Sequence, residues 1–121
     1  MSSEGGDEAR EVTDAGIEIR ELDGDEGPVV EGDFTVINNM GLHVRPATNL
    51  SITANKYAET QIWLSKEGGE GRVDAKGALP ILTLAGVCGT RYTLRASGPQ
   101  AREAIQELLE LAGRKFDVLD D

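Results

Sequence analysis

The sequence has 121 residues, of which 39% are apolar, so it can bury one modest hydrophobic core and is expected to form one domain rather than two. It carries 22 acidic against 12 basic residues, a formal charge of −10, which disfavours nucleic acid as a partner. No apolar run approaches a membrane span, the first residues lack the features of a secretory signal, and the single cysteine has no internal disulfide partner. We therefore expect a cytoplasmic protein that binds neither nucleic acid nor membranes.

The acidic charge is concentrated at the N-terminus. Residues 1–32 hold 11 acidic side chains and 2 arginines, whereas residues 33–121 are almost neutral. The first segment is also rich in glycine, so we expect residues 1–32 to be an acidic, disordered extension and residues 33–121 to be the folded domain. One alternative stays open for residues 12–22, because Ile17 and Ile19 alternate there with Glu18 and Arg20. That pattern is typical of a short strand that docks on a partner or on the domain's own edge.

From residue 34 onward, short alternating runs predict four strands, at residues 34–38, 60–65, 72–76 and 90–96. Apolar residues at helical spacing predict three helices, at residues 44–57, 77–85 and 101–113. Ser97 and Gln100 have the form of a capping box before the last helix. One apolar face on each element implies an α+β fold: a two-layer open-faced sandwich, with a four-stranded antiparallel sheet and three helices on one face.

The chain contains a single histidine, His43, which lies where a polar segment gives way to the first predicted helix. Pro46 fits the first turn, because it gives up an N–H that has no acceptor within the helix. The other N–H groups of this turn and the helix dipole attract anions, and Arg45 adds a planar donor fork suited to phosphate. A neutral imidazole has one nitrogen with a free lone pair, so this arrangement suggests a phosphoryl group carried on His43.

The run Gly41-Leu42-His43-Val44-Arg45-Pro46-Ala47 resembles the phosphorylation-site motif of HPr, the histidine-containing phosphocarrier family of the phosphoenolpyruvate-dependent phosphotransferase system. The resemblance extends from Phe34 to Phe116 and includes the segments Val73-Asp74-Ala75-Lys76 and Ser97-Gly98-Pro99-Gln100. It implies the sandwich described above, with the strand order 1-4-2-3.

The resemblance implies a phosphocarrier with a transient phosphohistidine rather than an enzyme. His43 would accept a phosphoryl group on Nδ1 from enzyme I, which is charged by phosphoenolpyruvate, and pass it to an enzyme II A-type domain in sugar transport. Arg45 would orient and neutralise the phosphoryl oxygens, and the backbone N–H groups of Val44 and Arg45 would hold them.

The resemblance also implies a docking surface for these partners on the second predicted helix, formed by Ala78, Leu79 and Leu82. Ordinary core packing is the alternative for the same three residues. No cofactor or metal is implied, because one histidine and one cysteine make no ligand set. We expect the chain to act as a monomer.

Two other functions stay open. A regulatory, nitrogen-type carrier would use the same His43 chemistry, but its phosphorylation state would signal to other proteins without sugar transport. A binding-only domain could hold an anion with Arg91 and Arg95, although this leaves the His43 motif unexplained.

The sequence also departs from the family at Gly77, where many HPr proteins carry a serine that an ATP-dependent kinase modifies. Glycine has no hydroxyl, so we expect no such switch at this position.

Overall fold

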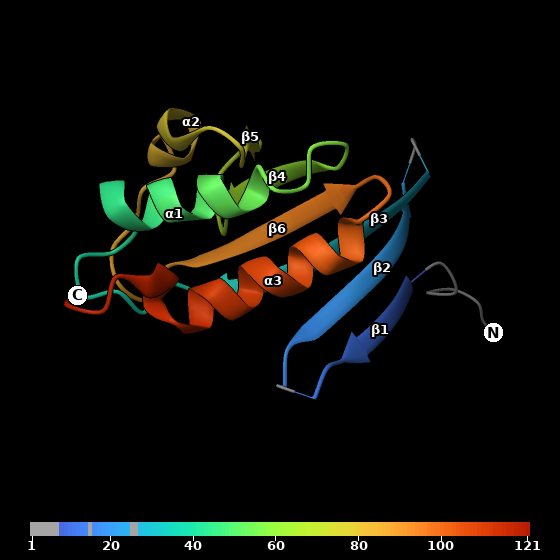
Figure 1. The fold of residues 1–121 in the computed structure, drawn as a ribbon, viewed down its shortest axis with the longest axis horizontal. Coiled ribbons are helices and arrows are strands. Elements are labelled where there is room, and N and C mark those ends of the chain that lie inside the picture. Colours follow the sequence, from blue (N-terminus) through green and yellow to red (C-terminus); the bar gives the residue numbers. More distant parts are fainter. Residues whose placement is uncertain (1–7, 15, 25–26) are drawn as a thin grey trace.

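The computed structural model describes residues 8–14, 16–24 and 27–121 (Figure 1). Within these residues the strands form one antiparallel sheet in the order β1-β2-β3-β6-β4-β5. The strands are β1 (Glu8–Val12), β2 (Glu18–Gly24), β3 (Gly27–Thr35), β4 (Gln61–Lys66), β5 (Val73–Asp74) and β6 (Arg91–Ser97). The helices are α1 (Val44–Ala54), α2 (Ala78–Leu82) and α3 (Ala101–Gly113), followed by the short 3-10 helix η1 (Lys115–Asp117). Every helix in this described part is too short or too polar to span a bilayer.

The helices cover one face of the sheet, with α1 and α3 side by side and α2 next to α1 (Figure 1). Alternate residues of the central strands point toward the helices and are fully buried, among them Leu64 of β4 and Leu94 of β6. They meet the apolar stripes of α1 and α3, which include Leu50 and Leu108. The opposite sheet face carries polar side chains and Trp63, as its alternation predicts. The expected α+β open-faced sandwich is therefore confirmed.

The sheet has more strands than predicted. The order β3-β6-β4-β5 matches the expected 1-4-2-3, and β1 and β2 extend the sheet beyond β3. The prediction of a disordered extension is therefore wrong for the described part of residues 1–32, which forms β1, β2 and the start of β3. β2 instead follows the alternative given for residues 12–22, a strand that adds to the domain's own edge. Residues 1–7 lie outside the described residues. The prediction of disorder made for these seven residues therefore also lies outside them.

The described strands of the extension are ordered because they share the domain's core and form ion pairs with it. Ile19 of β2 is 1% exposed and belongs to the main apolar cluster, on the side of the sheet covered by α3. Glu11 of β1 pairs with Arg102 of α3, and Arg10 Nη1 donates to Glu18 Oε2 at 2.7 Å. The amino-acid composition of residues 1–32 describes that segment in isolation, so composition alone could not predict these contacts.

Several predicted element ends differ from the structure: α1 ends at Ala54 rather than at residue 57, and β5 and α2 are shorter than the predicted 72–76 and 77–85. β3 begins at Gly27, so the expected boundary between residues 32 and 33 falls inside a strand. The expected capping box does not form, since the N-cap of α3 is Gln100 and makes no side-chain capping bond. The backbone N–H of Gln100 donates instead to Thr60 Oγ1 at 3.2 Å, which ties the helix start to the residue before β4.

Candidate functional site

The loop between β3 and α1 is held by a close backbone contact with the segment after α2. The N–H of Leu42 donates to the carbonyl of Gly86 at 2.9 Å, and Gly41 has a left-handed φ of 75°. A Cβ atom at position 41 would lie 2.1 Å from the Gly86 oxygen. Glycine is therefore required here both by conformation and by space, and the contact sets where His43 enters α1.

His43 is the N-cap residue of α1. Its backbone is extended, with φ −103° and ψ −162°, and its carbonyl accepts a hydrogen bond from Ala47 N–H at 3.0 Å. The imidazole makes no capping hydrogen bond and is 23% exposed. The N–H groups of Val44 and Arg45 follow in the first turn, where a helix offers them no acceptor. The structure thus brings the imidazole and these donors together at one helix start, a turn that contains no acidic side chain.

The carboxylate of Asp121, which the sequence did not single out, lies against the imidazole. His43 Nε2 and Asp121 Oδ2 are 2.7 Å apart, and the N–H of Met40 donates to Asp121 Oδ1 at 3.0 Å. The hydrogen bond from His43 is the main cause that lowers the pKa of Asp121 below its ordinary value of 3.8, and the one from Met40 adds to it. An ionised carboxylate can only accept, so Nε2 carries the proton and Nδ1 is the bare nitrogen of the neutral ring.

Asp121 reaches the imidazole because the chain turns back after α3. All three residues of η1 have a left-handed φ, of 57°, 54° and 61°, a conformation that is uncommon outside glycine. Phe116 is fully buried there and meets Phe34 edge to face, with ring centroids 5.6 Å apart. The side chains of Asn38 and Asn49 donate to the first two carbonyls of η1, at 2.9 and 2.8 Å. No helix or strand period encodes this segment, so sequence patterns could not have placed Asp121.

Arg45 is held loosely by the neighbouring acid. Its Nη1 lies 3.1 Å from Asp120 Oδ1, and the two side chains are 55% and 73% exposed. An ion pair this exposed contributes only about 0–1 kcal/mol. The guanidinium is therefore available to a more strongly charged group that arrives at the start of α1.

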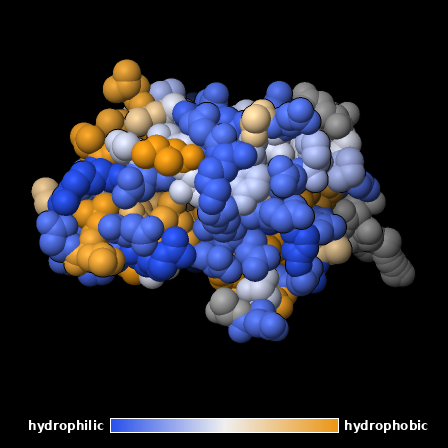
Figure 2. All heavy atoms as spheres, viewed as in Figure 1, coloured by the Kyte–Doolittle hydropathy of each residue, from blue (hydrophilic) through white to orange (hydrophobic). Residues whose placement is uncertain are grey.

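The three residues of α2 assigned to docking differ in exposure. Leu79 is 77% exposed, Ala78 is half-buried, and Leu82 packs partly against the core. Core packing therefore accounts for part of Leu82 but not for Leu79. Further large apolar side chains are exposed in the same part of the fold, on the loops and helix starts around the imidazole: Met40, Val44, Val87 and Leu119. In Figure 2, hydrophobic residues gather at the end of the molecule where Figure 1 places α2 and the start of α1.

The open sheet face is a poor anion site. Arg91 pairs with Asp33 at 3.2 Å and Arg95 pairs with Glu31 at 2.8 Å, so both guanidinium groups already face carboxylates. Among the described residues, no cluster of three or more His, Cys, Asp or Glu side chains could hold a metal ion. Gly77 is the N-cap residue of α2, so the position at which the sequence departs from the family lies at a helix start.

A single histidine at a helix N-terminus of a small α+β domain, with anion-binding groups beside it, is the arrangement of a group carrier. The family model described as "PTS HPr component phosphorylation site" matches residues 30–113. The chain therefore belongs to the HPr family of phosphocarrier proteins, which transfer a phosphoryl group by way of a histidine.

Individual relatives agree with this assignment. The phosphocarrier protein HPr of Cupriavidus necator is 34% identical over 88 residues, which cover 73% of this chain and 96% of the relative. The phosphocarrier protein NPr of Shewanella violacea is 33% identical over 88 residues, covering 73% and 93%. Among solved structures, HPr from Thermoanaerobacter tengcongensis is 36% identical, with a TM-score of 0.65, and the match covers 72% of this chain and 94% of that one.

Proposed function

We propose that His43 is the phosphoryl acceptor and that Nδ1 is its nucleophilic atom. The observation that carries this proposal is the 2.7 Å contact between His43 Nε2 and Asp121 Oδ2, which keeps the ring proton on Nε2. His43 is also the only histidine in this sequence, and the family to which the chain belongs transfers a phosphoryl group by way of a histidine. The other ring nitrogen then has its lone pair free without any base to remove a proton.

The transfer step follows from this arrangement. The lone pair of Nδ1 forms a bond to phosphorus while the bond between phosphorus and the donor breaks, so the ring gains positive charge. The carboxylate of Asp121 stabilises that charge through the Nε2 proton. When an acceptor attacks the phosphorus, the N–P bond breaks and the ring returns to its neutral form. Asp121 is a positioning residue in this scheme, since it acts through the imidazole.

Arg45 and the start of α1 would hold the phosphoryl oxygens. The phosphoryl group brings more negative charge than the carboxylate of Asp120, so Arg45 exchanges one partner for the other. The backbone N–H groups of Val44 and Arg45 supply fixed donors at the positive end of the helix dipole. Both interactions grow as charge develops on the transferred group, which is where they lower the barrier.

The partners we propose are phosphorylated enzyme I as donor and an enzyme II A-type domain as acceptor. Leu79, with Ala78 and the exposed part of Leu82, would provide the apolar contact to both. Support comes from family membership and from the exposed apolar residues around the start of α1. A nitrogen-type regulatory role remains the second candidate, because the NPr relative is 33% identical to the chain, against 34% for the HPr of Cupriavidus necator.

We also propose that residues 33–121 hold all the groups needed for phosphoryl transfer, and that the protein acts as a monomer in the cytoplasm. Residues 1–32, although their described strands share the sheet, would take no part in the chemistry. The described strands of the extension support this, because β2 contacts β3 and α3, whereas His43 begins α1 on the other side of α3. Gly77 offers no hydroxyl to a serine kinase, so phosphorylation would report transfer through His43 alone.

The direct test is labelling from radioactive phosphoenolpyruvate and enzyme I. Wild-type protein should take up one phosphoryl group per chain, and His43→Ala should remain folded and take up none. Label that persists in His43→Ala would contradict the assignment. Adding candidate sugar-system and nitrogen-system acceptors to the labelled protein then distinguishes the two roles, since only the physiological acceptor should remove the label rapidly.

A further inference from the structure

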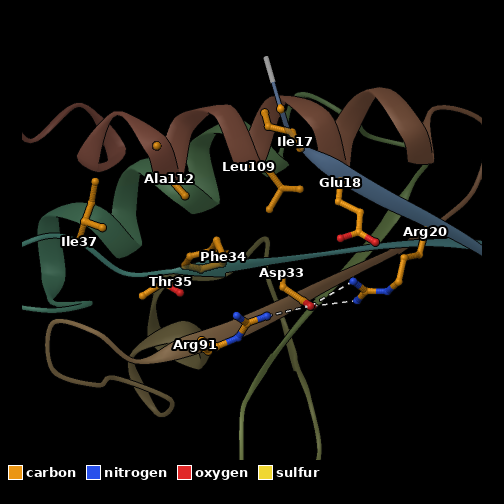
Figure 3. Close-up of a pocket in the computed structure, with 12 residues that line it drawn as sticks. Ile17, Glu18, Arg20, Asp33, Phe34, Thr35, Ile37, Arg91, Leu109 and Ala112 are labelled. Atoms are coloured by element: carbon orange, nitrogen blue, oxygen red, sulfur yellow. Dashed lines mark hydrogen bonds and ion pairs between the residues drawn. The ribbon is translucent and has the colours of Figure 1, made fainter. Parts of the chain in front are cut away.

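β2 and β3 are paired over only part of their length. Their register runs from Gly24 opposite Gly27 to Arg20 opposite Glu31, and it stops there. The start of β2 stays paired with β1 but separates from the end of β3. A pocket of about 320 Å³ occupies the space between the separated ends, below α3 (Figure 3). We name this pocket the β2–β3 slot.

Charge explains why the two strands separate at this point. If the register continued, Glu18 would lie opposite Asp33, and like charges directly opposite each other destabilise a sheet. Instead, Arg20 donates to both carboxylate oxygens of Asp33, at 2.8 and 3.1 Å, and Glu18 turns to Arg10 on β1. The slot is therefore built into the sequence of β2 and β3.

The end of β3 offers unpaired backbone groups to the slot. The N–H of Val36 donates to the Thr90 carbonyl at 2.9 Å, toward the β6 side. Backbone groups alternate in direction along a strand, so the N–H and C=O of Thr35 point the other way, toward the slot. The β2–β3 ladder ends before Thr35, and within the described residues no backbone group bonds it from that side. An unpaired strand edge is a template for an added strand.

The other residues that line the slot are either apolar or already paired with a residue of opposite charge. Ile17, just before β2, faces this space, as do Leu109 and Ala112 of α3. Phe34 lies below them (Figure 3). The charged lining consists of Asp33, which pairs with Arg20 and Arg91, and of Glu18, which pairs with Arg10. A free anion or cation would gain little from such a wall. The unsatisfied features are apolar surface and strand-edge backbone, which an extended peptide satisfies together.

We propose that the β2–β3 slot binds a short extended segment of a partner protein, which pairs with the backbone of Thr35 and inserts an apolar side chain between Ile17, Leu109 and Ala112. Side chains alternate along a strand, so only every second residue of the segment enters the apolar part. The segment is therefore uncharged at those positions and polar between them. This binding site is separate from His43, and its test does not depend on phosphoryl transfer.

The probe is a synthetic peptide of roughly seven residues, enough to cover the end of β3. It alternates valine with threonine, has one lysine at each end for solubility, and carries blocked termini. Titrated into the full ¹⁵N-labelled chain, it should shift the amide signals of Thr35, Ile17 and Gly113 in a saturable manner. The control peptide carries N-methyl groups on its central valine and on the threonine that follows, so the backbone donor that faces Thr35 is lost in either orientation of the peptide. It should bind at least about tenfold more weakly.

A matched pair of variants tests the protein side. Thr35→Pro removes the N–H that faces the slot and should weaken binding at least about tenfold, whereas Thr35→Val keeps it and should bind as wild type. The proposal is overturned if no saturable shifts occur, or if the N-methyl peptide binds equally well. It is also overturned if the shifts fall on the outer edge of β1 or around His43. Should Thr35→Pro fail to fold, the peptide pair still decides the question.

Discussion

At the scale of single residues, Asp121 decides which nitrogen of the imidazole carries the proton. Its carboxylate is 1% exposed and accepts from both His43 and the Met40 N–H. A residue that could also donate would give the ring the other tautomer, with the proton on Nδ1 and the lone pair directed at position 121. The nucleophile assigned to Nδ1 therefore depends on an acid far along the chain.

Asp121→Asn tests this dependence. The amide can still accept from the Met40 N–H, but its NH₂ donates to Nε2 and drives the proton to Nδ1. We expect phosphoryl uptake from enzyme I to slow by about tenfold or more, equivalent to ~1.4 kcal/mol of barrier. Rapid-quench labelling measures the rate, and a rate equal to that of wild type would contradict the role of Asp121.

The same residue gives a pH dependence of stability. The hydrogen bond from His43 lowers the pKa of Asp121 in the folded protein, so the ionised carboxylate stabilises the fold above its unfolded-state pKa. That contribution is lost as pH falls through the lowered pKa. In urea unfolding, wild type should be more stable than Asp121→Asn near neutral pH and should lose this advantage as the pH falls below the ordinary pKa of 3.8 and through the lowered one. Asp120→Asn, at the exposed neighbour, should show little difference at any pH, and equal profiles for both variants would contradict the argument.

We predict that Arg45 acts on the phosphoryl group rather than on the fold. Arg45→Ala should slow transfer by about 10-fold to 100-fold, the worth of a hydrogen bond to a charged group, and leave the melting temperature unchanged. Arg45→Lys should recover only part of the rate, because an ammonium lacks the two-pronged geometry of a guanidinium. Single-turnover transfer measures both, and full activity of either variant would remove Arg45 from the mechanism.

At the scale of the elements, the loop before α1 depends on the contact between Gly41 and Gly86. Gly41→Ala combines a left-handed φ of 75° with a Cβ 2.1 Å from a carbonyl oxygen. Gly68 has a similar φ of 80°, but a Cβ there would meet nothing within 4 Å. Gly68→Ala should therefore lose only about 1–2 kcal/mol of unfolding free energy, and Gly41→Ala clearly more. Similar losses in the two variants would show that the Gly86 contact is unimportant.

The β1–β2 extension contributes to stability through Ile19. Ile19→Ala should lower the free energy of unfolding by roughly 2–5 kcal/mol, because it leaves a cavity beneath α3. Val12→Ala, at a residue of the same extension that is 66% exposed, should change it by no more than about 0.5 kcal/mol. Phosphoryl uptake by the folded fraction should be unchanged in both. An Ile19→Ala protein as stable as wild type would mean that the extension packs on the domain without contributing to its stability.

At the scale of the whole molecule, sequence periodicity predicted the sandwich because its elements bury one face each. The alternation at Ile62 and Leu64, and the stripe from Ala47 to Leu50, read directly as a strand and a helix of that kind. The start of the sheet was missed because acidic composition outweighed the two isoleucines of residues 17–19. Their partner surface on α3 is about 85 residues away in the sequence, so no local pattern contains it.

Part of the candidate site could be predicted from the sequence, and part of it could not. His43, Val44 and Arg45 lie together in the sequence, so a local motif could identify them, and glycine and proline mark the helix start beside them. Asp121 is 78 residues from His43 and arrives only because η1 adopts three consecutive left-handed residues. Such a turn has no sequence signal apart from the buried Phe116, which alone resembles an ordinary core residue. The groups that tune the imidazole therefore required the structure.

The central claim is that a phosphoryl group is carried on Nδ1 of His43. Nuclear magnetic resonance of the uniformly ¹⁵N-labelled protein, phosphorylated by enzyme I and phosphoenolpyruvate, measures which ring nitrogen is coupled to phosphorus. We predict one phosphohistidine, with coupling to Nδ1 and a proton on Nε2. Coupling to Nε2, or a phosphoryl group on any residue other than His43, would contradict the account.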